Sequence, residues 1–343
     1  MSRKLNDTQT EPIKGLPYTS RSLLECIDRG AKSFGWKKRK PETGSMREGE
    51  WLIGYGCASA LYPAHIGAAA VRLIVQAGEG VRIQIAAHEI GTGTQTIIAG
   101  LVADKLSIPI DRIEVQLGDS DWPAAGISAG SIHAASVCNA VAKACEEARR
   151  RMAAADGRAN AAIEVYAENV PEGADPDAVK KIYRGQPSFA ENDSDVRYAF
   201  GAQFAEVRVH ARTREIRVPR IVGAFAAGTI LNPVTARSQL MGGMIWGVSA
   251  ALFEATEIDR RNARYVNTNF ADYLIPVNAD IPSAEAILVP EEDSKVNPLG
   301  IKGVGELGTV GMNAAIANAV YHATGRRVRD LPITIDKIIA GAA

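Results

Sequence analysis

The sequence has 343 residues, of which 46% are hydrophobic and 23% are charged, a composition typical of globular proteins. Its 39 basic and 39 acidic residues give a formal net charge of zero. Composition therefore predicts no long-range attraction to nucleic acid or to an anionic membrane surface. At ~150 residues per domain, the length suggests about two domains or subdomains.

The first part of the chain predicts one helix and then strands. Residues 1–19 are polar and are expected to form an extended lead-in, after which Thr19 or Ser20 can cap a helix. The apolar positions Leu23, Leu24, Ile27, Ala31 and Phe34 follow helical spacing, and Gly35 ends the run. From Trp51 the pattern changes to strands, and the segment 78–80 (Gly-Glu-Gly) predicts a hairpin turn.

The middle of the chain alternates between helical and strand patterns. The run 91–94 (Gly-Thr-Gly-Thr) precedes a helical pattern over 97–102, and 113–117 reads as a strand. A longer helix is expected through Val137 and Met152, followed by a polar, irregular stretch over 155–198.

The last third predicts a hairpin over 205–218 and a helix from Thr235 to about Phe253, just after Asn232-Pro233. A glycine-rich loop at 303–308 precedes a final helix that Gly325 can terminate. The mixture of hairpins and helices predicts an α+β fold with two mixed α/β subdomains rather than a doubly wound parallel sheet. We expect a linker and helix in 1–45, a first subdomain in 46–190 and a second in 191–343.

The cysteines and the N-terminus indicate cellular context. Cys138 and Cys145 are seven residues apart, as expected for two buried positions on one helix face, and Cys26 and Cys57 form no CxxC pair. An iron–sulfur cluster needs closely placed thiolates, so this chain should carry none. The polar start lacks the apolar stretch of a signal peptide, and no window approaches the ~20 apolar residues of a membrane span. A cytoplasmic location with free thiols is the expectation.

Three loops before predicted helices are rich in glycine and hydroxyl residues: 91–94, 128–131 and 303–308. A helix N-terminus offers free backbone N–H groups that suit oxyanions, and glycine lets a ligand approach the backbone closely. Each loop taken singly is equally well explained as a turn and a cap. Neither a Walker A sequence nor a G-x-G-x-x-G fingerprint is present, which disfavours ATP and dinucleotide redox cofactors.

Glu306 is unusual because it stands among Gly303, Gly305 and Gly308. It can be an acid that favours a helix dipole, or a general base exposed to a ligand. Gln239 can likewise be a cap or a surface residue. The five histidines lack the i, i+4 pairing of a zinc motif and are interpreted as structural, with His133 the least secure because it lies in a loop.

Taken in order, these segments resemble the C-terminal half of the molybdenum-binding subunit of the xanthine dehydrogenase/aldehyde oxidase family. The likeness is greatest to the large subunit of bacterial periplasmic-type aldehyde oxidoreductases, and it covers nearly the whole chain. The matching stretches are residues 89–96, 117–120, 128–131, 231–233, 238–239, 302–308 and 327–334.

The resemblance implies roles for individual residues. Glu306 would be the general base of a hydroxylation of aldehydes or N-heterocycles that takes its oxygen from water. Molybdenum would be held by the dithiolene of molybdopterin, in its cytosine dinucleotide form, and not by protein side chains. Ala129 and Gly130 would lie near the metal. The full set of implied cofactor-binding residues is Gly91, Thr92, Gly93, Thr94, Ser128, Ala129, Gly130, Ser131, Gln239, Lys302, Gly303 and Gly305.

The resemblance also implies partners, because a full subunit has an earlier half with its own cofactor loop. A separate chain would supply that half, an iron–sulfur subunit would carry [2Fe-2S] clusters, and a further subunit would carry FAD. Such complexes can be exported to the periplasm with a signal-bearing partner. The alternative function is a non-catalytic fragment that binds cofactor or other subunits without turnover.

Overall fold

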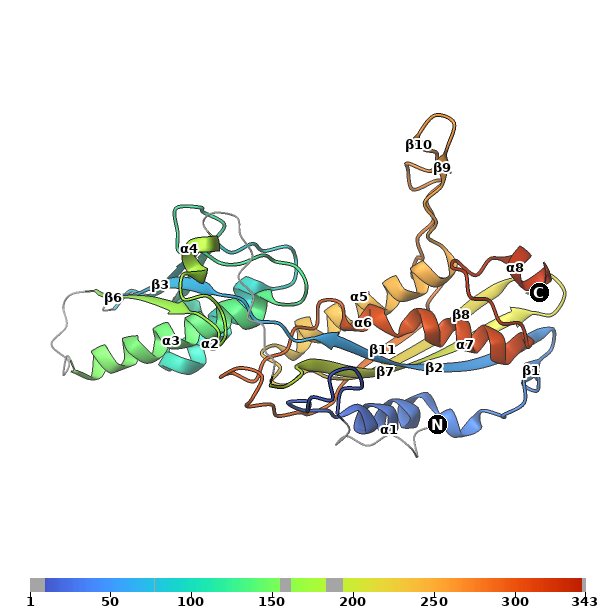
Figure 1. Ribbon diagram of the computed structural model, residues 1–343, viewed down its shortest axis with the longest axis horizontal. Coiled ribbons are helices and arrows are strands. Elements are labelled where there is room, and N and C mark those ends of the chain that lie inside the picture. The colour runs from blue at the N-terminus through green and yellow to red at the C-terminus, as the bar shows by residue number, and fades with distance from the viewer. Residues whose placement is uncertain (1–9, 77, 155–161, 183–193, 341–343) are drawn as a thin grey trace.

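The computed structural model describes residues 10–76, 78–154, 162–182 and 194–340. It has two lobes, each built on its own β-sheet with helices packed against it (Figure 1). Within the described residues, no helix is both long and apolar enough to cross a membrane.

The larger lobe contains a five-stranded sheet in the order β1-β2-β7-β8-β11. All neighbouring strands are antiparallel except β11, which runs parallel to β8. The strands span Arg47–Glu48 (β1), Trp51–Pro63 (β2), Tyr198–His210 (β7), Ile216–Ala226 (β8) and Ser283–Leu288 (β11).

Helices cover both faces of this sheet (Figure 1). Helix α1 (Leu23–Phe34) lies on one face, where Phe34 stacks on Phe204 of β7. On the other face lie α5 (Pro233–Leu252), α6 (Leu307–Val310) and α7 (Met312–Thr324), with α8 (Ile335–Ala340) at the end of the chain. Because both faces are covered, the central strand β7 is buried along most of its length, as is usual only for fully enclosed strands.

The smaller lobe contains a four-stranded sheet in the order β5-β4-β3-β6. Its strands are Ile113–Leu117 (β5), Gly80–Ile85 (β4), Ala69–Gln76 (β3) and Ile163–Asn169 (β6). Helices α2 (Thr94–Leu106) and α3 (His133–Ala154) pack on one face, and the short α4 (Ala178–Ile182) lies nearby. The core between sheet and helices includes the completely buried Leu73, Ile83, Ile98 and Val141. Short 3₁₀ helices are formed by Trp36–Lys38, after α1, and by Ile110–Arg112, before β5.

An arm projects from the larger lobe between α5 and β11 (Figure 1). It carries a two-stranded hairpin of β9 (Ile258–Asp259) and β10 (Arg264–Tyr265). Exposed large apolar side chains are frequent along it, and Phe270 is 82% exposed. Most of the arm therefore lies outside both cores, and its base contributes Ile281 to the core of the larger lobe.

Most predicted elements are confirmed, including the α+β class, the two hairpins and the helices that Gly35 and Gly325 terminate in the left-handed conformation. Cys138 and Cys145 are both buried on α3, as expected.

Three expectations need correction. Neither Thr19 nor Ser20 caps α1; Ser22 is the N-cap and makes no side-chain cap bond. The stretch 155–198, which was expected to be irregular, contains β6 and α4. Strand β6 pairs with β3, and its alternating pattern is difficult to detect because the strand includes charged residues. Residues 155–161 and 183–193 lie outside the described part of the chain. The division expected at 190 also does not follow the sheets, since β2 pairs with β1 and with β7, which lies beyond residue 190.

Candidate functional site

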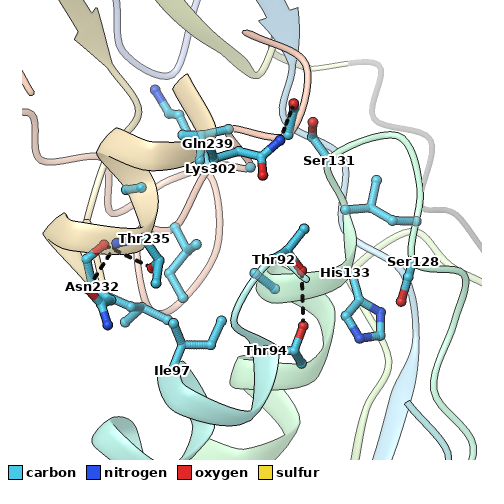
Figure 2. A pocket seen from close by; sticks show the side chains of 18 of the residues that line it. Thr92, Thr94, Ile97, Ser128, Ser131, His133, Asn232, Thr235, Gln239 and Lys302 are labelled. Atoms are coloured by element: carbon cyan, nitrogen blue, oxygen red, sulfur yellow. Dashed lines mark hydrogen bonds between the residues drawn. The ribbon is translucent and has the colours of Figure 1, made fainter. Parts of the chain in front are cut away.

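A cavity of about 350 Å³ lies where the two lobes meet. The smaller lobe contributes the starts of α2 and α3, and the larger lobe contributes the start of α5 and the loop 301–306. In Figure 2, Thr92 and Thr94 lie across the cavity from Thr235 and Gln239. A second cavity of about 150 Å³ shares Thr92, Thr235 and Gln239 with the first and extends the site toward Ser238 and Gly242.

The wall at the start of α2 is organised by the Glu89 carboxylate. Its Oε1 accepts hydrogen bonds from the backbone N–H groups of Gly91 and Gly93 at 2.9 and 3.1 Å, and its Oε2 accepts one from Gln95 at 3.1 Å. Partial burial acts to raise the pKa of Glu89, but these backbone donors outweigh it and hold that pKa below its usual value. The anion-binding end of α2 is thus already occupied by a side chain.

The backbone N–H groups of Gly91 and Gly93 both donate to Glu89, and the contact of these two glycines with a cofactor stays a prediction. The α2 wall also offers the hydroxyls of Thr92 and Thr94, which lie 3.4 Å apart and line the cavity. Glu89 is a site residue that the sequence analysis did not single out, and its position two residues before a glycine turn is the local signal for its capping role.

Two glycines leave room for a ligand on this side. A Cβ atom added at Gly91 would meet nothing within 4 Å, and one added at Gly130 would meet only the edge of Ile132 at 3.9 Å. Both have positive φ angles, 92° and 59°, which L side chains rarely adopt. Gly130 lines the first cavity and Gly91 lines the second, so each leaves space for a ligand to approach the backbone.

The start of α3 forms the next part of the wall. Ser128, Ala129, Gly130, Ser131 and His133 all line the cavity. The Ser128 hydroxyl donates to the carbonyl of His88 at 3.2 Å. Burial lowers the pKa of His133, and neither of its ring nitrogens has a hydrogen-bond partner among the described residues. We therefore expect His133 to be neutral at pH 7, as its interpretation as a structural residue requires.

On the opposite wall, Asn232 fixes the start of α5. Its Oδ1 accepts from the backbone N–H groups of Val234 and Thr235 at 2.9 and 3.2 Å, a standard N-cap. One turn later, Gln239 donates from Nε2 to the carbonyl of Gly305 at 2.8 Å (Figure 2). Gln239 is therefore neither a cap nor a free surface residue, because it joins α5 to the loop that carries Glu306.

The loop from Ile301 to Gly308 is fixed at its base by a buried ionic cluster. The Lys302 ammonium lies 2.8 Å from Glu291 Oε2 and 3.0 Å from Asp293 Oδ2, and it also donates to Ser20. The side chains of Lys302 and Asp293 are completely buried and that of Glu291 is 2% exposed. Lys302 was expected to contact the cofactor, but its charge is used within this cluster, and the residue only lines the cavity.

Two amides hold the rest of the loop. Asn297 accepts from the N–H of Ile301 at 3.2 Å and donates to its carbonyl at 2.7 Å. Gln203, buried on β7, donates to the carbonyl of Gly308. The partner of Gln203 lies 105 residues away in the chain, whereas that of Asn297 is only four residues away.

Glu306 lies at the end of this loop, as the N-cap residue of the four-residue helix α6, yet its side chain makes no cap hydrogen bond. Its Oε2 instead accepts from the Ser131 hydroxyl at 2.6 Å. Partial burial, together with a hydrogen bond to Glu306 and the charge of Glu306, raises the pKa of Tyr62 at the end of β2. The simple helix-start interpretation of Glu306 is therefore not supported, and Tyr62 is a site residue that the sequence did not reveal.

The site can bind a ligand with both polar and apolar parts and present a carboxylate to it. Hydroxyls, an amide and apolar side chains such as Ile97 and Leu231 line the cavity, and Glu306 is part of the lining. Within the described ranges, no group of three or more His, Cys, Asp or Glu side chains could hold a metal ion. Any metal here would have to arrive as part of a bound cofactor.

A family model described as a molybdopterin cofactor-binding domain matches residues 29–282. The chain belongs to that family. It is 38% identical to the aldehyde oxidoreductase molybdenum-binding subunit PaoC of Escherichia coli (strain K12), over 98% of this chain and 47% of that protein. It is 30% identical to the putative xanthine dehydrogenase molybdenum-binding subunit XdhA of the same organism, over 94% of this chain and 46% of that protein.

Solved structures agree with this molybdopterin cofactor-binding fold. The aldehyde oxidoreductase from Desulfovibrio desulfuricans ATCC 27774 matches with a TM-score of 0.78 and 23% identity, over 96% of this chain and 36% of that one. Quinoline 2-oxidoreductase from Pseudomonas putida 86 matches with a TM-score of 0.75 and 20% identity, over 97% and 47% of the two chains. At these identities the likeness establishes the fold alone.

The resemblance to molybdenum-binding subunits of the xanthine dehydrogenase/aldehyde oxidase family is therefore confirmed. The chain spans about half the length of the curated relatives it matches. The roles of individual site residues remain predictions that rest on the geometry above.

Proposed function

We propose that this chain supplies one wall and the general base of a molybdenum hydroxylase that oxidises aldehydes or N-heterocycles with oxygen from water. The observation that carries the proposal is the position of Glu306, whose carboxylate lies at the lining of a cavity bounded by the three predicted cofactor loops. Among the curated relatives, PaoC is named an aldehyde oxidoreductase subunit and XdhA a putative xanthine dehydrogenase subunit.

The residues present fit a molybdopterin cofactor. Thr92, Thr94, Thr235 and Gln239 would hold it through hydroxyl and amide groups, and the open backbone at Gly91 and Gly130 would lie against its flat ring system. When bound, the cofactor supplies the metal centre that accepts electrons from the substrate, while the protein supplies position and electrostatics. The adjoining second cavity extends the site beyond the first, which supports an elongated form such as molybdopterin cytosine dinucleotide.

Glu306 has the properties of a general base for this chemistry. Its carboxylate is partly buried and held by a neutral hydroxyl, and no cation lies within ion-pair distance among the residues described. A carboxylate held in this way can take up a proton from a water-derived hydroxyl group. Such a base commonly contributes about 10²- to 10⁴-fold to a rate.

We also propose that another chain completes the site. The chain spans only about half of its relatives, and the lining described above comes from two loops of each lobe. Large apolar side chains are exposed on the arm and on α5, including Phe270 at 82%, Val234 at 73% and Trp246 at 54%. Exposed apolar surface of this kind marks a protein interface. The partner would carry the remainder of the molybdenum subunit, and further subunits would carry [2Fe-2S] and FAD for electron transfer.

Metal analysis tests this proposal against the alternative of a non-catalytic fragment. The chain would be purified alone and together with a protein matching the other half of PaoC-like subunits. We expect stoichiometric molybdenum and pterin in the complex and little in the chain alone. Absence of molybdenum from both preparations contradicts the enzyme proposal.

Replacing the base is the sharpest test of mechanism. In the assembled complex, Glu306→Gln preserves side-chain volume but cannot accept a proton, so we expect normal molybdenum content and a fall in kcat of at least about 10²-fold. The exposed Glu146→Gln, on the solvent face of α3, is the matched control and should leave kcat unchanged. Near-normal turnover by the Glu306 variant would show that another group acts as the base.

A further inference from the structure

Ser131 and Glu306 are joined by two hydrogen bonds that form a closed ring. The Ser131 hydroxyl donates to Glu306 Oε2 at 2.6 Å, and Ser131 Oγ also accepts from the backbone N–H of Glu306 at 3.1 Å. One hydroxyl therefore contacts both the backbone and the carboxylate of Glu306. This arrangement restrains the side chain rotation that would otherwise be open to a glutamate in a glycine-rich loop.

The Ser131 hydroxyl is held in place because the backbone of Ser131 lies against the backbone of the loop that carries Glu306. A Cβ atom added at Gly303 would lie 1.6 Å from the carbonyl oxygen of Ser131, and one added at Gly305 would lie 2.8 Å from its Oγ. Ser131 also adopts a φ angle of 59°, which is unusual for a residue other than glycine. The backbone thus places the hydroxyl at Glu306 at some conformational cost, as is seen at functional sites.

The two partners belong to different lobes. Ser131 precedes α3 of the smaller lobe, whereas Glu306 ends the anchored loop of the larger lobe. A second bond between the lobes lies close by, where Asn139 of α3 donates to Asn297 at 3.2 Å. The geometry of the carboxylate therefore depends on the two lobes being seated against each other.

Other groups near Glu306 leave its negative charge intact. Tyr62 from β2 offers a neutral hydroxyl, and the Lys302 ammonium is bound to Glu291 and Asp293. Among the described residues, no ion pair to Glu306 is found within 4 Å. Ser131 therefore holds the carboxylate by hydrogen bonding alone.

We propose that Ser131 is a positioning residue that orients Glu306 as the general base and couples this orientation to the docking of the two lobes. The inference rests on the proposed function and assigns Ser131 a role other than the cofactor contact expected from the sequence. It assigns the cofactor contacts on that wall to the backbone of Ala129 and Gly130.

The test compares Ser131→Ala and Ser131→Gly in the assembled complex. Both remove the hydroxyl, and glycine suits the φ angle of 59°, so the pair separates loss of the bond from backbone strain. We expect molybdenum and pterin content to stay unchanged, kcat to fall about 10- to 100-fold, and KM to change less than about threefold. Ser45→Ala, which removes an exposed hydroxyl bonded to the carbonyl of Glu42, should change none of these values.

Infrared difference spectroscopy supplies a readout independent of turnover. In the complex without cofactor, the carboxylate band of Glu306 is identified as the band that Glu306→Gln lacks. This band should shift in frequency in both Ser131 variants. An unshifted band, or loss of molybdenum from both variants, would overturn the proposal and make Ser131 a cofactor ligand. If the wild-type complex held no molybdenum, the proposed function would fail, while the infrared result would still decide whether Ser131 holds Glu306.

Discussion

The two walls of the cavity are stabilised in different ways. In the wall from the smaller lobe, the turn before α2 is held by the single exposed carboxylate of Glu89. In the wall from the larger lobe, the loop that carries Glu306 is held by a buried ionic cluster and by amides from Gln203, Gln239 and Asn297.

This difference fits the task that the proposed function gives to each wall. A wall that contacts a large, flat cofactor needs open backbone and hydroxyls, and a light anchor at its edge leaves that surface free. A general base needs a fixed direction toward its proton, and misplacement by about 1 Å can cost about 10²-fold in rate. The rigid wall is therefore the one that carries Glu306.

The largest effect on stability should follow from removing the buried charge of the rigid wall. Lys302→Met leaves Glu291 and Asp293 buried without their cation, and breaking such a cluster costs about 3–5 kcal/mol. Chemical denaturation would measure this loss. Lys295→Met, an exposed lysine in the neighbouring segment, should stay within about 0.5 kcal/mol of the wild type.

The same cluster predicts how stability depends on pH. Burial acts to raise the pKa of Asp293, but the Thr19 hydroxyl and Lys302 outweigh it and hold that pKa below 3.8. A carboxyl whose pKa is lowered by folding contributes stability above its unfolded value, and that contribution is lost as pH falls through the lower folded value. The cluster should thus stay intact down to about pH 4. Equal stability of Lys302→Met and wild type at pH 7 would mean that the cluster does not fix the rigid wall.

A smaller effect is expected at the light anchor. Glu89→Gln removes the negative charge that accepts three backbone N–H groups, but the site is exposed, so the global loss should be about 1 kcal/mol or less. The local effect should be clearer, as faster hydrogen exchange at Gly91, Gly93 and Gln95. In the wild type, hydrogen exchange at these amides should also become faster at low pH. The change should begin as the pH falls below 4.5, the usual pKa of a glutamate, and continue through the lower pKa of folded Glu89. Unchanged exchange at these three amides would contradict the assigned anchor.

An effect of similar size is expected at the helix that carries Gln239. Asn232→Ala removes the cap of α5 and should cost about 1 kcal/mol, with little change in the kcat of the complex. Thermal unfolding would measure this loss, and Asn232→Ser, which retains a capping oxygen, should restore most of it. A fall in kcat as large as that expected for the Ser131 variants would place α5, rather than Ser131, in control of Glu306.

Local sequence signals predicted the parts of this site that depend on neighbours in the chain. The spacing of apolar residues predicted α1, α2, α3, α5 and α7, because one helix face has to be buried. The glycine runs before these helices identified the cofactor loops. Glu89 could also have been found, since it contacts residues only two to six positions away.

Other features depend on residues far apart in the sequence and could not be predicted. The pairing of β2 with β7, nearly 150 residues later, determines that residues 51–63 belong to the larger lobe. Tyr62 reaches Glu306, and Lys302 reaches Ser20, only because of this packing. A single sequence does not indicate which polar side chains become buried partners.

By itself, the sequence determined most of the helices, two hairpins, the α+β class, the family resemblance and the choice of Glu306 as candidate base. These depend on periodicity and short motifs, which are local properties of the chain. The tertiary structure decided that Lys302 belongs to a buried ionic cluster, that Glu89 occupies the anion-binding end of α2, and that Ser131 holds Glu306. Each of these depends on which polar groups lose their water together, and that is settled only when the chain has folded.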